Sequence, residues 1–303
     1  MSRSKVVALA ALVVAGVLAI MAYGSLTEAP AQRAVAAAAR AQNSAIPQVT
    51  VTLSDDHTET PATVPTGMVA VRYTNAGSAP LSVTLVQLTE GATVEDLRAA
   101  FATEGEAAFD RFAAAGLGGP GVFPPGAMQE FVHDLAPGAY VIASFPIDEE
   151  ESGDGGAPDA ATLAALFRPG FTAVPPPTAT EPPSSAGTIE LGDFFFRAPA
   201  IPAGTNTFAV TNAGEQLHHL IVFKLAEGLS FADIEAMFAA GEDPFAAGLL
   251  ESAPGVSELT PGATAWPTLS FTPGNYAMLC FIEDPATGLE HADLGMVQPF
   301  TVP

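Results

Sequence analysis

Short runs in which apolar and polar residues alternate recur along most of the chain. Each run is bounded by Gly, Pro or Asn, which is the pattern of half-buried β-strands separated by tight turns. The runs of the first half are 48–54, 68–74, 81–88, 130–135, 139–145 and 171–174. Those of the second half are 188–196, 206–212, 218–225, 265–271, 276–282 and 297–302. This spacing predicts an all-β chain of two tandem Greek-key β-sandwiches.

A helical pattern interrupts each half at the same place. The first is expected to begin after Thr93 and the second after Ser230, since each of these residues is followed three positions later by an aspartate, as in a capping box. Apolar residues at helical spacing give both helices one apolar face. We expect each helical insertion to cover one end of its sandwich.

The two halves are copies of one another. Three four-residue motifs of the first half recur 137 positions later, and Pro-Gly-Ala-Tyr at 137–140 recurs as Pro-Gly-Asn-Tyr at 273–276, an offset of 136. A fixed offset of this kind indicates an internal duplication. We therefore interpret 48–174 and 187–303 as two domains of the same fold. The Pro-rich segment 175–186 between them favours an extended, semi-stiff linker.

The N-terminus carries a targeting signal. Residues 1–24 have a short basic start followed by an apolar run, the pattern of a signal peptide or a membrane anchor. Residues 25–47 are Ala-rich and are interpreted as a tether. We expect an exported protein that is periplasmic, extracellular or anchored on the outer side of the cytoplasmic membrane.

The charge balance is strongly acidic. The 33 Asp and Glu residues against 10 Lys and Arg residues give a net charge of −23. Such a surface repels nucleic acid and anionic lipid, so a membrane is expected only through the N-terminal anchor. A partner protein with a basic face is favoured instead.

The candidate chemistry lies near the C-terminus. Cys280 is the only cysteine, and it is followed by His291 and Met296. A second imidazole is available from the adjacent pair His218 and His219 in an upstream strand. A thiolate, imidazoles and a thioether are soft and borderline ligands that suit copper.

This order of residues, together with the upstream stretch Thr-Asn-Ala-Gly-Glu-Gln-Leu-His-His-Leu-Ile-Val-Phe at 211–223, resembles the cupredoxins, the blue or type 1 copper proteins. The resemblance covers almost all of the second copy. It implies one copper ion per chain in a trigonal site of Cys280 and two imidazoles, with Met296 as a weak axial ligand. It also implies that single electrons pass through His291 as the more exposed imidazole.

The duplication favours one of the two adjacent histidines. His218 aligns with Leu81 of the first copy, and the alternation of that strand places Leu81 on the core face. His218 is therefore the predicted ligand. His219 remains the alternative ligand. If His218 binds the metal, His219 is expected to support the ligand residues from outside the coordination sphere.

The first copy holds no equivalent of these ligands. Ser144 stands at the position of Cys280, about Phe167 at that of Met296, and Leu81 and Ser82 at those of the histidine pair. The first copy is therefore predicted to be a metal-free module. Its own His57 and His133 are interpreted as surface or edge residues, and the second copy's Phe194–Phe196 cluster as core.

These observations favour an exported electron carrier over a catalyst. One alternative is a copper carrier or chaperone, and another is a metal-free interaction module. A copper oxidase or a nitrite-reductase-like enzyme is less favoured, because such enzymes use several more histidines for a catalytic copper and only five are present.

Overall fold

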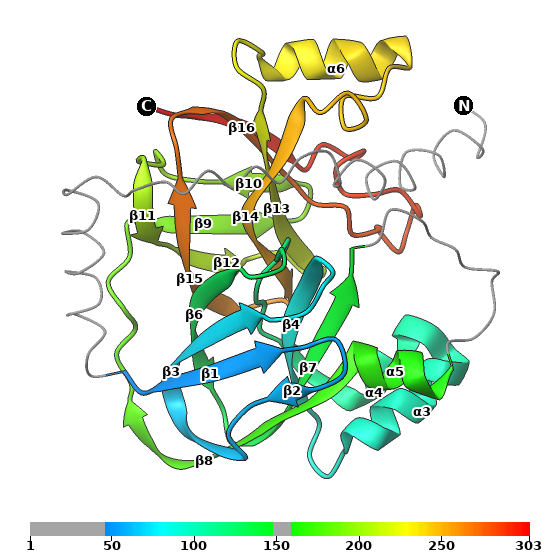
Figure 1. Ribbon diagram of the computed structural model, residues 1–303, viewed down its shortest axis with the longest axis vertical. Coiled ribbons are helices and arrows are strands. Elements are labelled where there is room, and N and C mark those ends of the chain that lie inside the picture. Colours follow the sequence, from blue (N-terminus) through cyan, green and yellow to red (C-terminus); the bar gives the residue numbers. More distant parts are fainter. Residues whose placement is uncertain (1–45, 148–158) are drawn as a thin grey trace.

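A computed structural model describes residues 46–147 and 159–303 (Figure 1). The predicted signal or anchor at 1–24 and nearly all of the tether at 25–47 lie outside these residues. None of the helices in the described part of the chain is long and apolar enough to cross a membrane. The architecture is strand-based throughout, so the prediction of an all-β fold is confirmed.

The first repeat is a sandwich whose two layers are joined by one long strand. One layer has the order β2-β1-β3-β6 and the other β8-β7-β4-β5. β8 pairs with β7 through its first half and with β3 through its second half, so it belongs to both layers. The strands are β1 (Gln48–Leu53), β2 (Thr58–Glu59), β3 (Thr63–Asn75), β4 (Leu81–Leu88), β5 (Ala113–Gly116), β6 (Met128–Leu135), β7 (Gly138–Pro146) and β8 (Phe167–Ala179).

The second repeat has the same two layers. One has the order β10-β9-β12-β15, with β11 also on β15, and the other is a separate four-stranded sheet, β14-β13-β16-β17. The strands are β9 (Thr188–Gly192), β10 (Phe195–Arg197), β11 (Gly204–Thr207), β12 (Ala209–Asn212), β13 (His218–Leu225), β14 (Leu250–Leu259), β15 (Thr264–Phe271), β16 (Gly274–Leu279) and β17 (Val297–Val302). The chain crosses from one layer to the other after β12, after β14 and after β15, as in a Greek key.

The strand register follows the duplication residue by residue. Leu85 pairs with Ile142 in the first repeat, and Val222 pairs with Met278, at the equivalent positions, in the second. Two asparagines that begin the corner before β4 and β13 also behave alike. The Asn75 side chain donates to the carbonyls of Ala79 and Phe123, and Asn212 donates to the equivalent carbonyls, those of Gln216 and Leu259.

The two repeats share one sheet. β15 pairs antiparallel with β6, and the pairing includes Pro267 opposite Phe131. A second contact brings Val256 opposite Pro120. The residues of both pairs are 136 positions apart, so each is a pair of equivalent positions. Two copies that meet through the same residues on both sides are related by a pseudo-two-fold axis.

The helices cover the outer faces of the sheets rather than the ends of the sandwiches. α3 (Val94–Glu104) buries Leu97 against the face of β4 and β7 that points away from the main core, and α6 (Phe231–Ala240) buries Ile234 against β13 and β16. Both predicted capping boxes are present, with Thr93 and Ser230 as the caps. Two further short helices, α4 (Ala108–Phe112) and α5 (Ala160–Leu166), lie beside α3 (Figure 1).

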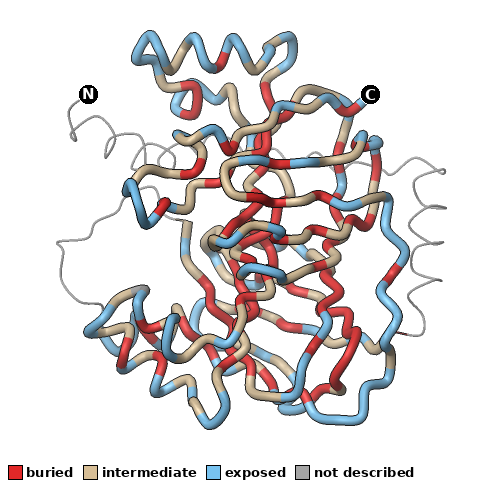
Figure 2. Tube along the Cα trace, turned by 180° about the vertical axis from the view of Figure 1, so that it is seen from behind, coloured by how far each residue is buried: buried red, intermediate tan, exposed pale blue. Residues whose placement is uncertain are grey.

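The buried residues gather between the layers and at the joint of the repeats, while the helices are exposed on their outer sides (Figure 2). One continuous core cluster runs through both repeats, and it includes Cys280 and Met296. The predicted metal corner is therefore an extension of the hydrophobic core.

Candidate metal centre

The candidate site is formed where β13 begins and β16 ends. His218 is the first residue of β13, and Cys280 follows the last residue of β16. Because these strands are antiparallel neighbours, the two side chains meet at the same end of the sheet. The loop from Cys280 to Met296 then returns to this point, with the N–H groups of Ala292 and Met296 donating to the carbonyls of Cys280 and His291.

Three donor atoms converge there. The Sγ atom of Cys280 lies 3.5 Å from Nδ1 of His291 and 3.9 Å from Nδ1 of His218, and the two Nδ1 atoms are 3.1 Å apart. Ligands held about 2 Å from a common ion lie roughly 3–4 Å from one another. The three residues form the single group of convergent His, Cys, Asp or Glu donors found within residues 46–147 and 159–303. All three are fully buried.

Met296 lies at the edge of this group. It is fully buried in the same core cluster as Cys280, and its carbonyl accepts the N–H of Cys280 at 3.3 Å. Its position immediately before β17 fixes it next to the strand that carries Cys280. The structure thus brings all four predicted residues to one corner.

The Nε2 atoms of both imidazoles, which face away from the thiol, are hydrogen-bonded. Nε2 of His218 lies 2.9 Å from the carboxylate of Asp193, and Nε2 of His291 lies 2.9 Å from Oε1 of Gln216. Both partners are acceptors, so they assign the ring proton to Nε2 in each histidine. Each Nδ1 atom is then an unprotonated donor that faces the thiol of Cys280.

The partner of His291 is itself oriented. The amide nitrogen of Gln216 donates to Asp284 at 3.0 Å, and Asp284 also accepts the hydroxyl and N–H of Thr287. These bonds hold the pKa of Asp284 below its usual value, chiefly through the Thr287 hydroxyl. The chain His291–Gln216–Asp284 therefore has one consistent direction of donation, ending on an ionised carboxylate.

Burial keeps the thiol and the two imidazoles neutral without a metal. It raises the pKa of the Cys280 thiol to about 11, and it lowers the pKa values of both His218 and His291. Burial alone would raise the pKa of Asp193. Hydrogen bonds from the N–H of Glu215 and from His218 outweigh this effect, so that its pKa lies below the usual value.

His219 does not join the donor group. Its Nε2 accepts the N–H of Phe281 at 2.7 Å, which ties β13 to the residue after Cys280. Burial lowers its pKa to about 3, so the imidazole is neutral and suited to accept this bond. The structure thus places His218 among the donors and His219 behind them.

The turn between β9 and β10 contributes residues that, like Gln216 and Asp284, were not identified from the sequence as parts of the site. Asp193 and Phe194 form the turn between β9 and β10, and Phe194 has a positive φ of 65°. The ring of Phe194 packs edge-on against His291, with the ring centroids 5.3 Å apart.

The prediction that His291 is the more exposed imidazole is wrong, because both histidines are fully buried. Of the predicted core cluster 194–196, only Phe196 is a core residue.

Gly214 allows Asp193 to reach His218. A Cβ atom at this glycine would lie 2.3 Å from the Asp193 carboxylate and 2.7 Å from Nε2 of His218. Any side chain here would therefore displace one of the two partners. Gly214 is the last residue of the repeated Thr-Asn-Ala-Gly motif. The motif alone does not show that two side chains pack against this glycine.

Among its described residues, 46–147 and 159–179, the first repeat has no convergent group of donors at this corner. Ser144 is buried and donates its hydroxyl to the carbonyl of Ala165 at 3.0 Å. The strand register places Phe167 opposite Ala143 and Val297 opposite Leu279, so Phe167 corresponds to Val297 rather than to Met296.

His57 is exposed, as predicted. His133 is instead fully buried and hydrogen-bonded to the Tyr73 hydroxyl at 3.2 Å, which corrects the prediction of a surface or edge residue.

No protein-family model matches the chain, and no curated protein is significantly similar to it in sequence. Solved structures similar to it include the dithionite-reduced auracyanin from Roseiflexus castenholzii, at 24% identity, 40% of this chain, 98% of that chain and a TM-score of 0.27. Auracyanin A, a "blue" copper protein from Chloroflexus aurantiacus, has 20% identity over 38% of this chain and 98% of that chain, with a TM-score of 0.25. A copper-containing nitrite reductase from Thermus scotoductus has 9% identity over 84% of this chain and 61% of that chain, with a TM-score of 0.23.

Proposed function

We propose that the second repeat binds one copper ion through Cys280, His218 and His291, with Met296 as axial ligand, and that the protein carries single electrons. One observation carries this proposal. Two Nδ1 atoms without protons face one another 3.1 Å apart, and the only hydrogen atom near them belongs to one thiol. That hydrogen can satisfy one nitrogen, and neither imidazole is exposed to the surrounding solvent. A bound cation satisfies both nitrogens at once.

The donor set favours copper among the candidate metals. One thiolate, two imidazoles and a nearby thioether are the ligands of blue-copper electron-transfer sites. A bound copper ion would supply a one-electron couple between Cu(I) and Cu(II). The chain's own contribution is to hold the donors still, because Asp193 and Gln216 orient the imidazoles and the core encloses the thiol.

The proposal extends to the location and the partner. The apolar run within residues 1–24 supports export, with the mature protein periplasmic, extracellular or anchored on the outer side of the membrane. The net charge of −23 supports a redox partner with a basic face, since opposite charges raise the rate of encounter. Electron transfer rates with such a partner should fall as the salt concentration rises.

The visible spectrum of the copper-loaded protein tests the site. We expect an intense band of thiolate-to-copper charge transfer that Cys280→Ser removes completely. Met296→Leu should keep the band and shift the reduction potential, because the axial ligand tunes the potential without forming the thiolate bond. Ser144→Ala, at the equivalent position of the first repeat, is the matched control and should change neither property. A colourless protein after loading with copper would show that the proposal is wrong.

Copper stoichiometry and voltammetry separate the carrier from its rivals. One copper per chain with reversible one-electron cycling supports an electron carrier. One copper that does not cycle reversibly supports a copper carrier or chaperone. Two or more coppers per chain support an oxidase-like or nitrite-reductase-like enzyme.

A further inference from the structure

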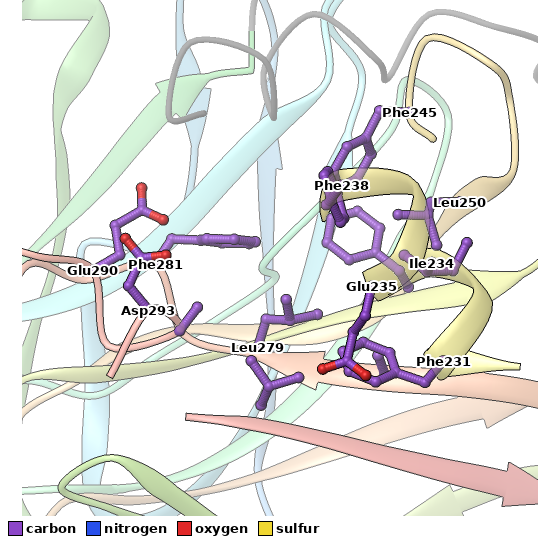
Figure 3. A pocket seen from close by; sticks show the side chains of 14 residues that line it. Phe231, Ile234, Glu235, Phe238, Phe245, Leu250, Leu279, Phe281, Glu290 and Asp293 are labelled. Carbon is purple, nitrogen blue, oxygen red and sulfur yellow. The ribbon is translucent and has the colours of Figure 1, made fainter. Parts of the chain in front are cut away.

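A pocket of about 350 Å³ lies between α6 and the sheet that carries the candidate metal centre (Figure 3). Its walls are mainly apolar and include five phenylalanines, from α6, the segment after it, β13 and the segment just after β16. The aromatic residues among them are Phe223, Phe231, Phe238, Phe245 and Phe281. This volume is within the range of pockets for small ligands.

In the first repeat, the equivalent space contains the ring of Phe167. There, three phenylalanines surround the ring of Phe167, with centroid distances of 4.8, 5.8 and 6.0 Å to Phe101, Phe109 and Phe145. Offsets of 136 or 137 relate these three to Phe238, Phe245 and Phe281, which line the pocket of the second repeat. The same aromatic cage is thus present in both repeats.

In the second repeat a different phenylalanine fills only part of the cage. Phe223, which stands where the first repeat has Val86, packs against Phe245 and Phe281 with ring centroids 5.0 and 6.4 Å apart. Val297 stands at the register position of Phe167, and it lines the pocket instead of filling it. Helix α5, which closes the cage of the first repeat with Leu163, is replaced by the loop that carries His291. The open volume therefore lies beside Phe223, where the small side chain of Val297 stands in place of the ring of Phe167.

The rim of the pocket is acidic. Glu290 and Asp293 lie on the loop side and Glu235 on the α6 side, as Figure 3 shows, and no Lys, Arg or His lines the pocket. An aromatic cage bordered by carboxylates attracts a cation through both the ring faces and the opposite charge. The aromatic walls are also recessed, since none of them is among the large hydrophobic residues exposed in the described part of the chain. Recessed walls fit a small molecule rather than the flat face of a protein.

We propose that this pocket binds a small aromatic cation of the arylalkylamine class, with the ring beside Phe223 and Val297 in the aromatic cage and the ammonium group at the carboxylates. The inference does not depend on copper binding. It concerns a site beside the candidate metal centre and outside its donor group.

Calorimetric titration of the full chain with three matched probes tests the charge preference. The cation 2-phenylethylammonium should bind, and the neutral 2-phenylethanol should bind about fivefold more weakly, as expected for the loss of a partly exposed ion pair. The anion 3-phenylpropionate should bind more weakly still. No binding of the cation, or equal binding of the cation and the anion, would overturn the proposal.

Three variants locate the binding. Val297→Phe restores the ring of the first repeat and should abolish binding of both the cation and the neutral probe, with circular dichroism checking that the variant folds. Glu235→Gln should weaken the cation about threefold to fivefold and leave 2-phenylethanol unchanged. Glu242→Gln removes the same charge just beyond α6 and outside the pocket, and it should leave cation binding unchanged.

Two results would contradict the assignment of the site. One is a folded Val297→Phe variant that binds like the parent protein. The other is equal weakening by Glu235→Gln and Glu242→Gln, which would mean that only the overall charge attracts the probe. If Val297→Phe does not fold, the comparison of the two glutamate variants decides the question.

Discussion

The carboxylate of Asp193 lies 2.9 Å from Nε2 of His218, and this contact joins the two layers of the second sandwich at the candidate metal centre. Asp193 belongs to the turn of β9 and β10 in the larger sheet, whereas His218 begins β13 in the four-stranded sheet. The contact fixes the ring proton on Nε2 and leaves Nδ1 free for a metal.

Replacing this carboxylate should weaken copper binding. Asp193→Asn keeps an acceptor oxygen but loses the charge, and we expect copper affinity to fall about 10- to 100-fold, the usual effect of losing a group that orients a metal-bound histidine. Competition with a chelator of known affinity measures the change. Asp55→Asn, which alters the corresponding turn of the first repeat, is the control and should leave copper affinity unchanged.

Gly214→Ala tests the close approach of the same two side chains. The added Cβ would clash with both Asp193 and His218, whereas in the first repeat Gly77→Ala would bring a Cβ to 2.6 Å from the Asp55 carboxylate. Both variants should lower the free energy of unfolding by about 1–3 kcal/mol. Only Gly214→Ala should also lower copper affinity. Equal copper affinities in the two variants would contradict the role given to Gly214.

Acid should destabilise the protein through His133. Burial lowers the pKa of this histidine to about 3 in the folded state, against an ordinary value of 6.5. Between these values the unfolded chain binds a proton that the folded chain does not, so this contribution to stability is complete above pH 6.5 and is lost as the pH falls. At pH 5 the loss is about 2 kcal/mol.

His133→Leu should make that pH dependence shallower. Leucine is the residue at the equivalent position of the second repeat, Leu269, where it is fully buried. Urea unfolding of the copper-free protein at pH 7, 6 and 5 measures the effect. Some dependence should remain, because His219 is also buried with a pKa of about 3. An unchanged slope would show that His133 does not take up a proton on unfolding.

The hydroxyl of Ser257 should contribute measurably to the stability of the interface between the repeats. Ser257 is fully buried, and its Oγ donates to the carbonyl of Val83 in the other repeat at 2.6 Å. Ser257→Ala leaves that carbonyl without its partner and should cost about 1–2 kcal/mol in urea unfolding. Ser270→Ala removes an exposed hydroxyl of β15 and serves as the control, with an expected change below about 0.5 kcal/mol.

Local patterns were sufficient to predict most strands, the capping boxes and the corner that holds Cys280 and His291. Alternation and turn residues are local signals, so they predict strands from a few neighbouring positions. The duplication provided a second, equivalent segment against which each predicted strand could be compared. β14 was missed because Pro254 and Gly255 interrupt its pattern. It forms because it pairs with β13, with a shift in register near these residues.

The contacts that complete the site depend on distant parts of the chain. Asp193 lies 25 positions before His218, and Gln216 lies 75 positions before His291. An acidic turn residue and a glutamine are ordinary surface features until the fold brings them to an imidazole. The exposure of His291 was mispredicted for the same reason, because Phe194 reaches it from another sheet.

The pseudo-two-fold joint has a consequence for how the two halves can differ. Because Phe131 meets Pro267 and Pro120 meets Val256, each half docks through the surface that its counterpart also uses. This is the geometry of an isologous interface, which two identical copies would also form. Within one chain the halves need not be identical. The first can therefore carry Ser144 and Phe167 where the second carries Cys280 and Val297, while both keep the residues of the shared joint.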